Sequence, residues 1–138
     1  QGWIGSYVHS NGKIGVIVEV LCETDFVAKN DQFQELIRDI AMHIAAMNPQ
    51  ALVPEELDPE LIERERAVFL EQVADKPEAI RGNIVEGKLN KFFSEVCLIK
   101  QAFIKDDKKS IEQVVTDAIA TIGENIQLTR FSRFEIGQ

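Results

Sequence analysis

Residues 13–22 read KIGVIVEVLC, and their alternation predicts a β-strand that is buried on one face. The even positions are all apolar: Ile14, Val16, Val18, Val20 and Cys22. The odd positions mix apolar with charged residues: Gly15, Ile17, Glu19, Leu21 and Glu23. This pattern is typical of an antiparallel sheet with one face on a core and the other only partly covered.

The residues just before this strand predict its partner. Residues 2–8, GWIGSYV, are rich in strand-forming residues, and HSNG separates them from the strand at 13–22. The Asn11-Gly12 pair suits a tight turn, because both residue types tolerate a positive φ. The two segments are therefore expected to form a β-hairpin.

The segment after the hairpin has helical periodicity. Residues 31–47, DQFQELIRDIAMHIAAM, place apolar residues three and four positions apart: Phe33, Leu36, Ile37, Ile40, Ala41, Ile44 and Ala45. Asp58-Pro59 predicts the start of a second helix over 60–74, and a third is expected from about Pro77 to Val96. A capping pattern at Ser110 and Gln113 predicts a helix that Gly123 ends.

Two further strands complete the expected order ββ-ααα-β-α-β. One is predicted over 97–104, CLIKQAFI, and one over 124–137. In the latter the parity of Phe131 disagrees with its neighbours, which a bulge or an extra partner on the second face would explain. We therefore expect one α+β domain over residues 1–138. It should hold an antiparallel sheet of about three to four strands, with helices packed mainly on one face.

Composition excludes several functions. The net charge of −8, from 15 Lys and Arg against 23 Asp and Glu, disfavours direct binding to nucleic acid. No apolar run approaches the length of a membrane span, and no signal-peptide pattern is present. Cys22 and Cys97 are expected to be reduced core residues. Because the chain starts at Gln1 rather than Met, we expect a fragment or a processed product.

Catalytic chemistry has little support in the sequence. Gly82 and Gly87 lack the Gly-Lys-Ser/Thr context of a phosphate-binding loop. The carboxylates of Glu19, Glu23 and Asp25 are close in sequence, but a charged strand edge explains them better than acid–base catalysis does. We therefore expect no catalytic residue, no metal site, no cofactor and no enzymatic activity.

Two residues keep two interpretations each when only spacing is used. Phe26 lies in CETDFVAKN, residues 22–30, between the predicted strand and helix, and could pack under that helix or face a partner. His43 falls at the edge of the apolar stripe of the helix at 31–47. It could be a boundary residue that keeps one nitrogen in water, or it could contact a partner.

Five segments closely resemble the elongation factor Ts family. They are VEVLCETDFVAKND (18–31), GSYVHSNGKIGVIVE (5–19), DIAMHIAAMNP (39–49), GKLNKFFSEVCLIKQAFIKDD (87–107) and IGENIQLTRFSRFEIG (122–137). The family is the guanine-nucleotide exchange factor for the translational GTPase elongation factor Tu. The resemblance therefore implies that this chain binds elongation factor Tu, both GDP-bound and nucleotide-free, and promotes GDP release.

The resemblance also implies which residues contact the GTPase. They are Asp25 and Phe26 of TDFV, Ile14 and Gly15 of the hairpin, and His43 of the helix motif. It implies that Phe26 points outward and inserts between helices of the GTPase domain. The position four residues before His43 is histidine in some members but Asp39 here, so that contact is not expected.

The match resembles the short form of the family, in which one core unit carries both the TDFV and the IAMHIA motifs, and such forms pair into homodimers. The small N-terminal three-helix domain of the family is not found here, which is expected for a chain cut at the linker before Gln1. Ile17 and Leu21 on the second sheet face offer apolar area for pairing. A bacterial cytoplasm or an organelle of bacterial descent fits this family. Two alternatives stay open: a structural module of the same fold that does not promote exchange, and a hydrolase that uses Glu23 and Asp25.

Overall fold

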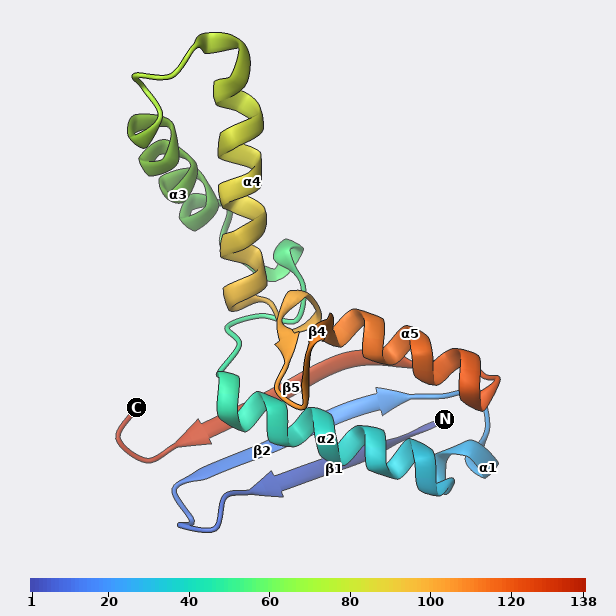
Figure 1. Ribbon diagram of the computed structural model, residues 1–138. Helices are drawn as coiled ribbons and strands as arrows, with labels where there is room; N and C mark the ends of the chain where they lie inside the picture. The colour runs from blue at the N-terminus through green and yellow to red at the C-terminus, as the bar shows by residue number, and fades with distance from the viewer.

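The computed structural model describes all residues from Gln1 to Gln138. Its main sheet has three antiparallel strands in the order β1-β2-β5, with bounds β1 (Gly2–Val8), β2 (Ile14–Leu21) and β5 (Gln127–Glu135). Figure 1 shows β2 between its two partners, with helices on one side of the sheet. The predicted α+β class with an antiparallel sheet is confirmed.

The strand at the centre of the sheet is buried on the face that the alternation predicted. Val16, Val18 and Val20 are at most 3% exposed. The predicted hairpin also forms, but its turn is longer than two residues, because the pairing closes with a hydrogen bond from His9 N to Ile14 O. Only Gly12 in this turn has a positive φ, of 70°.

The disturbed parity of β5 comes from a bulge, one of its two predicted causes. The register with β2 shifts between Glu19, which pairs with Arg130, and Val20, which pairs with Leu128. Thr129 is the extra residue, so a β-bulge lies there. The bulge lets both Leu128 and Phe131 pack toward the core.

Two helices, α2 (Asp31–Met47) and α5 (Ile111–Ile122), lie side by side on the inner face of the sheet. Both begin at a side-chain cap: Asn30 accepts from the amides of Gln32 and Phe33, and Ser110 accepts from Gln113 N. The α2 stripe is wholly buried, with Phe33, Ile40 and Ile44 at 0% exposure. This packing forms the main core of the protein.

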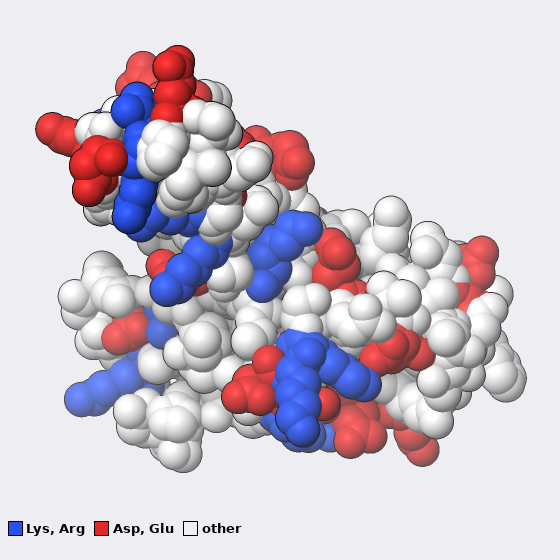
Figure 2. Space-filling model, turned by 45° about the horizontal axis from the view of Figure 1, so that its top comes forward, with Lys and Arg blue, Asp and Glu red and all other residues white.

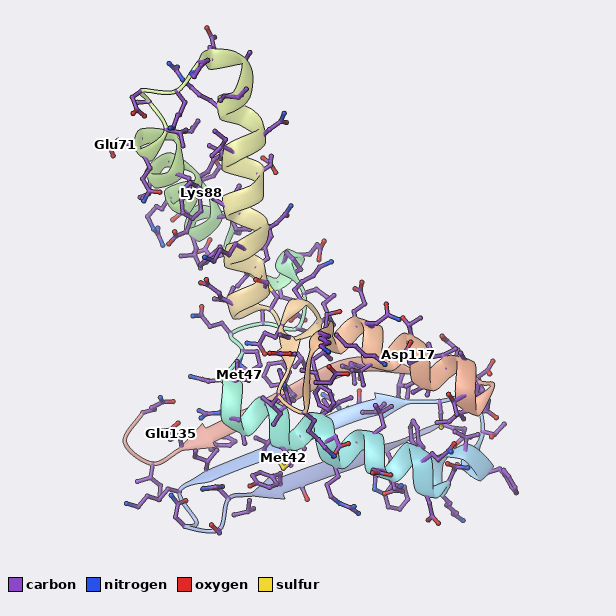
Figure 3. All side chains as sticks on the ribbon, in the orientation of Figure 1. Met42, Met47, Glu71, Lys88, Asp117 and Glu135 are labelled. Carbon is purple, nitrogen blue, oxygen red and sulfur yellow. The ribbon has the colours of Figure 1, made fainter.

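Helices α3 (Pro59–Gln72) and α4 (Glu78–Val96) do not cover the sheet. They pack against each other as an arm that leaves the sheet layer, as Figure 1 shows. Their contact is centred on Val73, Val85 and Leu89. Lys88 lies between the two helices (Figure 3), with its Nζ 5.8 Å from the centre of the Phe69 ring. The expectation that helices pack mainly on one face therefore holds for α2 and α5, but not for the arm.

The predicted strand over 97–104 is mostly wrong. Residues Leu98–Lys100 form a 3₁₀ turn, η2, and the only strand within 97–104 is β3 (Ala102–Phe103). It pairs with β4 (Asp106–Ser110) in a second, two-stranded sheet. The amide of Leu98 donates to Ala51 O, so this segment bonds to the loop after α2 and not to the main sheet. Two short elements remain: α1 (Asp25–Ala28) and the 3₁₀ turn η1 (Pro54–Glu56).

Candidate functional site

The junction that carries Phe26 is a single helical turn, α1. Its N-cap is Thr24, whose hydroxyl accepts a hydrogen bond from Val27 N at 3.2 Å. Val27 and Ala28 turn inward and are 7% and 3% exposed. Phe26 points the other way and is 86% exposed, the highest value for any large apolar side chain in the chain. Of the two interpretations that spacing left open, packing of the ring under α2 is therefore wrong, and the outward ring implied by the resemblance is what the fold shows.

The turn before α1 is held by a residue far along the chain. Glu124 Oε1 accepts from the amides of Glu23 and Thr24, both at 3.1 Å, and its Oε2 accepts from the Thr24 hydroxyl at 2.8 Å. In return, Glu23 Oε2 accepts from Asn125 N at 3.1 Å. Asp25 is exposed at the first position of α1. Glu23 therefore serves a structural contact, which argues against hydrolysis by Glu23 and Asp25.

Ile14 and Gly15 lie at the opposite end of β2 from Phe26. Since β2 has eight residues, the two ends are roughly 25 Å apart. A groove of about 320 Å³ runs beside Ile14 and Gly15. Its wall carries the side chains of Phe134 and Ile136, which are 75% and 73% exposed. The structure therefore does not bring the predicted contact residues together in one cluster.

His43 is a core residue rather than one at the edge of the stripe. Its ring is 0% exposed, and both nitrogens are bonded. Ile104 N donates to Nδ1 at 3.2 Å, so the proton is on Nε2, which donates to Gln101 Oε1 at 2.9 Å. Gln101 Nε2 in turn donates to Glu95 O. The interpretation with one nitrogen in water is thus wrong. A direct contact of this ring with a partner stays a prediction that requires residues 101–104 to move.

The buried imidazole makes stability depend on pH. Burial lowers the pKa of His43, so the unfolded chain, with a histidine pKa of about 6.5, binds this proton more readily than the folded one. The stability from His43 is complete above that pH and is lost as pH falls below it. We expect the unfolding free energy in urea to decrease from pH 7.5 to 5.5, and His43→Gln to flatten the decrease. An equal slope in both proteins would contradict this.

The outer face of the main sheet has no helix over it. Ile4 and Ile17 are 55% and 52% exposed there and border a cavity of about 220 Å³. Glu19 lies beside them. Its pKa is lowered by a hydrogen bond from the Thr129 hydroxyl at 2.7 Å and then by Arg130 at 3.0 Å. The face is thus apolar in part, with a paired charge at its centre.

The structure gives little support for a metal site, a membrane span or a basic binding surface. No group of three or more His, Cys, Asp or Glu residues is arranged to hold a metal ion. No helix combines the length and the apolar character that a membrane span requires. Basic and acidic side chains are interspersed over the face shown in Figure 2, without one continuous basic area. The two exposed apolar ends of the sheet and its outer face therefore remain as the candidate binding surfaces.

The family model for elongation factor TS matches residues 1–138. This chain belongs to the elongation factor Ts family. The elongation factor Ts of Oleidesulfovibrio alaskensis is 57% identical to it over 139 residues, which cover 99% of this chain and 70% of that protein. The elongation factor Ts proteins of Geotalea uraniireducens and Geobacter sulfurreducens are 49% and 50% identical over 140 residues, all of this chain and 65% of theirs.

Membership confirms the family that the sequence segments indicated. Elongation factor Ts is the nucleotide exchange factor for elongation factor Tu in translation elongation, so the family partner is a GTPase and the family is not one of enzymes. These relatives are bacterial. The chain spans 65% to 70% of their length.

One residue of the site was missed by the sequence reasoning. Glu124 lies in the segment IGENIQLTRFSRFEIG, but its contacts are with Glu23 and Thr24, about a hundred positions earlier. The stop signal at Gly123, which has a φ of 87°, places Glu124 just outside the end of α5. The sequence predicts this position of Glu124, but it does not predict that Glu124 contacts Glu23 and Thr24.

Proposed function

We propose that this chain binds elongation factor Tu and accelerates the release of its GDP through the exposed ring of Phe26. The observation that carries the proposal is the 86% exposure of that ring on a turn whose first residue, Thr24, is bonded to Glu124 and caps the turn. A large aromatic side chain is rarely left in water without a reason, and aromatic residues are frequent binding hot spots. Phe26 brings apolar area with only two side-chain torsions to restrict.

The mechanism needs only differential binding. A GTPase holds its nucleotide mainly through the phosphates and Mg²⁺. Insertion of Phe26 between helices of the GTPase domain shifts the supports of that site and weakens GDP. By linkage, GDP must weaken the binding of this chain by the same factor. GTP binding then displaces it, and no nucleotide or metal is required on this chain.

The second contact region is the groove beside Ile14 and Gly15. Phe134 and Ile136 expose their side chains there, so the groove can bury apolar area at the other end of the sheet. Asp25 at the first end is free to accept a hydrogen bond from the partner. Two contacts roughly 25 Å apart, from the length of β2, require a partner of domain size, which a GTPase supplies. A direct contact of His43 with the partner would require residues 101–104 to move, because its ring is buried and both of its nitrogens are bonded within the chain.

The test is the release of a fluorescent GDP analogue from elongation factor Tu, with and without this chain. Faster release supports the exchange function. The alternative function, a structural module, predicts binding with an unchanged GDP off-rate. Absence of both binding and release would reject the GTPase as the partner. Titrating the chain to saturation separates weak binding from an inability to promote release.

We further propose that the outer sheet face pairs with a second copy of the chain. Ile4 and Ile17 expose apolar area there, Leu21 is half-buried beside them, and an isologous contact would cover this face on both copies. The residues 1–138 then act as one unit in each copy. The bacterial relatives favour a bacterial cytoplasm, or an organelle of bacterial descent, as its location.

Ile17→Asp tests the pairing. We expect it to weaken self-association more than about tenfold, because a carboxylate would be buried without a partner. Sedimentation velocity at several concentrations measures this. Ile80→Asp is the matched control, since Ile80 is 44% exposed on the arm, away from the sheet. A monomeric mass of the unaltered protein at working concentration would reject the homodimer.

A further inference from the structure

We propose that Glu124 is a positioning residue for Phe26: its carboxylate sets the orientation of α1 and thereby the direction of the exposed ring. This inference rests on the proposed function, because it assigns a role within the Phe26 contact. It concerns a residue outside the segments 13–22, 22–30 and 39–49, which carry the predicted contacts. Glu124 itself need not touch the partner.

The geometry of the carboxylate supports this role. One oxygen of Glu124 accepts from two successive backbone amides, those of Glu23 and Thr24, and the other accepts from the Thr24 hydroxyl at 2.8 Å. Hydrogen bonds to an ionised acceptor are stronger than those between neutral groups. Three of them on one side chain fix the position and the direction of the backbone where α1 begins.

The Thr24 hydroxyl carries this constraint into the helix. It donates its proton to Glu124, so its lone pairs face the other way, and it accepts from Val27 N at 3.2 Å. Val27 is the residue directly after Phe26. The chain of bonds from Glu124 through Thr24 therefore ends within one residue of the exposed ring.

Glu124 is itself held in place. Gly123 ends α5 in the left-handed region, and its amide donates to Ile119 O at 2.8 Å. Ile126, two residues later, is 3% exposed in the main core. Asn125 N donates to Glu23 Oε2 at 3.1 Å, which makes the contact between the two segments reciprocal. The carboxylate thus reaches the turn from a fixed point of the fold.

The turn needs such a contact because α1 has only four residues. Isolated helices of this length are not stable in water. The free energy needed to form the first helical turn is larger than the free energy gained from one or two hydrogen bonds. Without Glu124 the amides of Glu23 and Thr24 lose their acceptor and face water. The ring would then sample several directions, and partner binding would have to restore one of them.

The decisive experiment is a double-mutant cycle of Glu124→Ala with Phe26→Ala, read by GDP release and by affinity for elongation factor Tu. We expect Glu124→Ala to weaken binding about five- to tenfold, the usual cost of ordering a short segment. The release rate at saturating factor should stay near that of the unaltered protein. In the Phe26→Ala background, Glu124→Ala should have no further effect. Independent, additive losses would overturn the proposal.

Two further variants test whether the loss of affinity comes from the carboxylate of Glu124. Glu124→Gln retains one acceptor oxygen without the charge and should give an intermediate loss of affinity. Glu112→Ala removes a glutamate of α5 that pairs with Lys100 at 3.9 Å, away from α1, and should leave binding unchanged. Equal losses from Glu124→Gln and Glu112→Ala would overturn the role of the carboxylate.

A measurement on the free chain separates this inference from the proposed function. Amide order parameters of residues 24–27 should fall in Glu124→Ala and stay unchanged in Glu112→Ala. If they fall while the unaltered protein releases no GDP, the exchange function fails and the positioning by Glu124 stands. Unchanged order parameters at residues 24–27 overturn the positioning even where exchange is established.

Discussion

Phe26→Ala lowers the affinity for elongation factor Tu by about 2 kcal/mol, which is more than tenfold in the dissociation constant, while the chain stays folded. The loss of affinity and the unchanged fold both follow from the exposure of the ring. Because the ring is 86% exposed, the core loses no contact when it is removed. The partner loses the largest apolar side chain that this surface presents.

The measurement combines GDP release with a urea unfolding curve for each variant. Leu70→Ala is the control, since Leu70 is 45% exposed on the arm and lies outside both proposed contact regions. Leu70→Ala should change neither the rate of GDP release nor the urea unfolding curve. If Phe26→Ala instead lost stability by several kcal/mol, the ring would be a core residue and its exposed placement would be wrong. Unchanged release would remove Phe26 from the contact.

Gly5→Ala destabilises the fold by about 1–3 kcal/mol, because the new methyl group has no space. Gly5 pairs with Val18 in the main sheet, and a Cβ there would overlap Cγ2 of Ile37 in α2. Since Ile37 is 2% exposed, its side chain has no free direction in which to move. Helix α2 must therefore shift away from β1 or the chain must lose packing.

Gly15→Ala is the matched control for this substitution. It is also a strand glycine, but a Cβ there meets no atom within 4 Å. It should leave stability unchanged or raise it slightly, because alanine restricts the unfolded chain more than glycine does. Urea unfolding of both variants measures the difference. Equal stabilities would show that α2 adjusts its distance from the sheet at little cost.

The elements with strong periodicity could be predicted from the sequence, and their partners could not. The alternation in β2 and the stripe of α2 each identify one buried face, because burial imposes the period. Periodicity cannot predict which element packs against the apolar face of a helix. The stripes of α3 and α4 face each other rather than the sheet. Strand β4, DDKKS, was missed because it has no apolar residue to alternate.

The site was predictable only where a contiguous motif carries it. Spacing left Phe26 undecided, and the resemblance gave its outward direction. His43 was misplaced because the periodicity of α2 describes one helix alone, while the residues from Gln101 to Ile104 cover its far side. Glu124 could not be predicted, since its contact joins segments about a hundred residues apart. Contacts between distant segments follow from the fold and not from local pattern.

The arm formed by α3 and α4 has the geometry of a lever. Its nineteen-residue helix α4 is about 28 Å long, and it meets the rest of the chain through the small cluster of Ala51, Leu57, Val96 and Cys97. A rotation of roughly ten degrees at that cluster would move the far end of α4 by about 5 Å, given the rise per residue of a helix. A small change of packing at the base of the arm would therefore move a tip that these side chains do not touch.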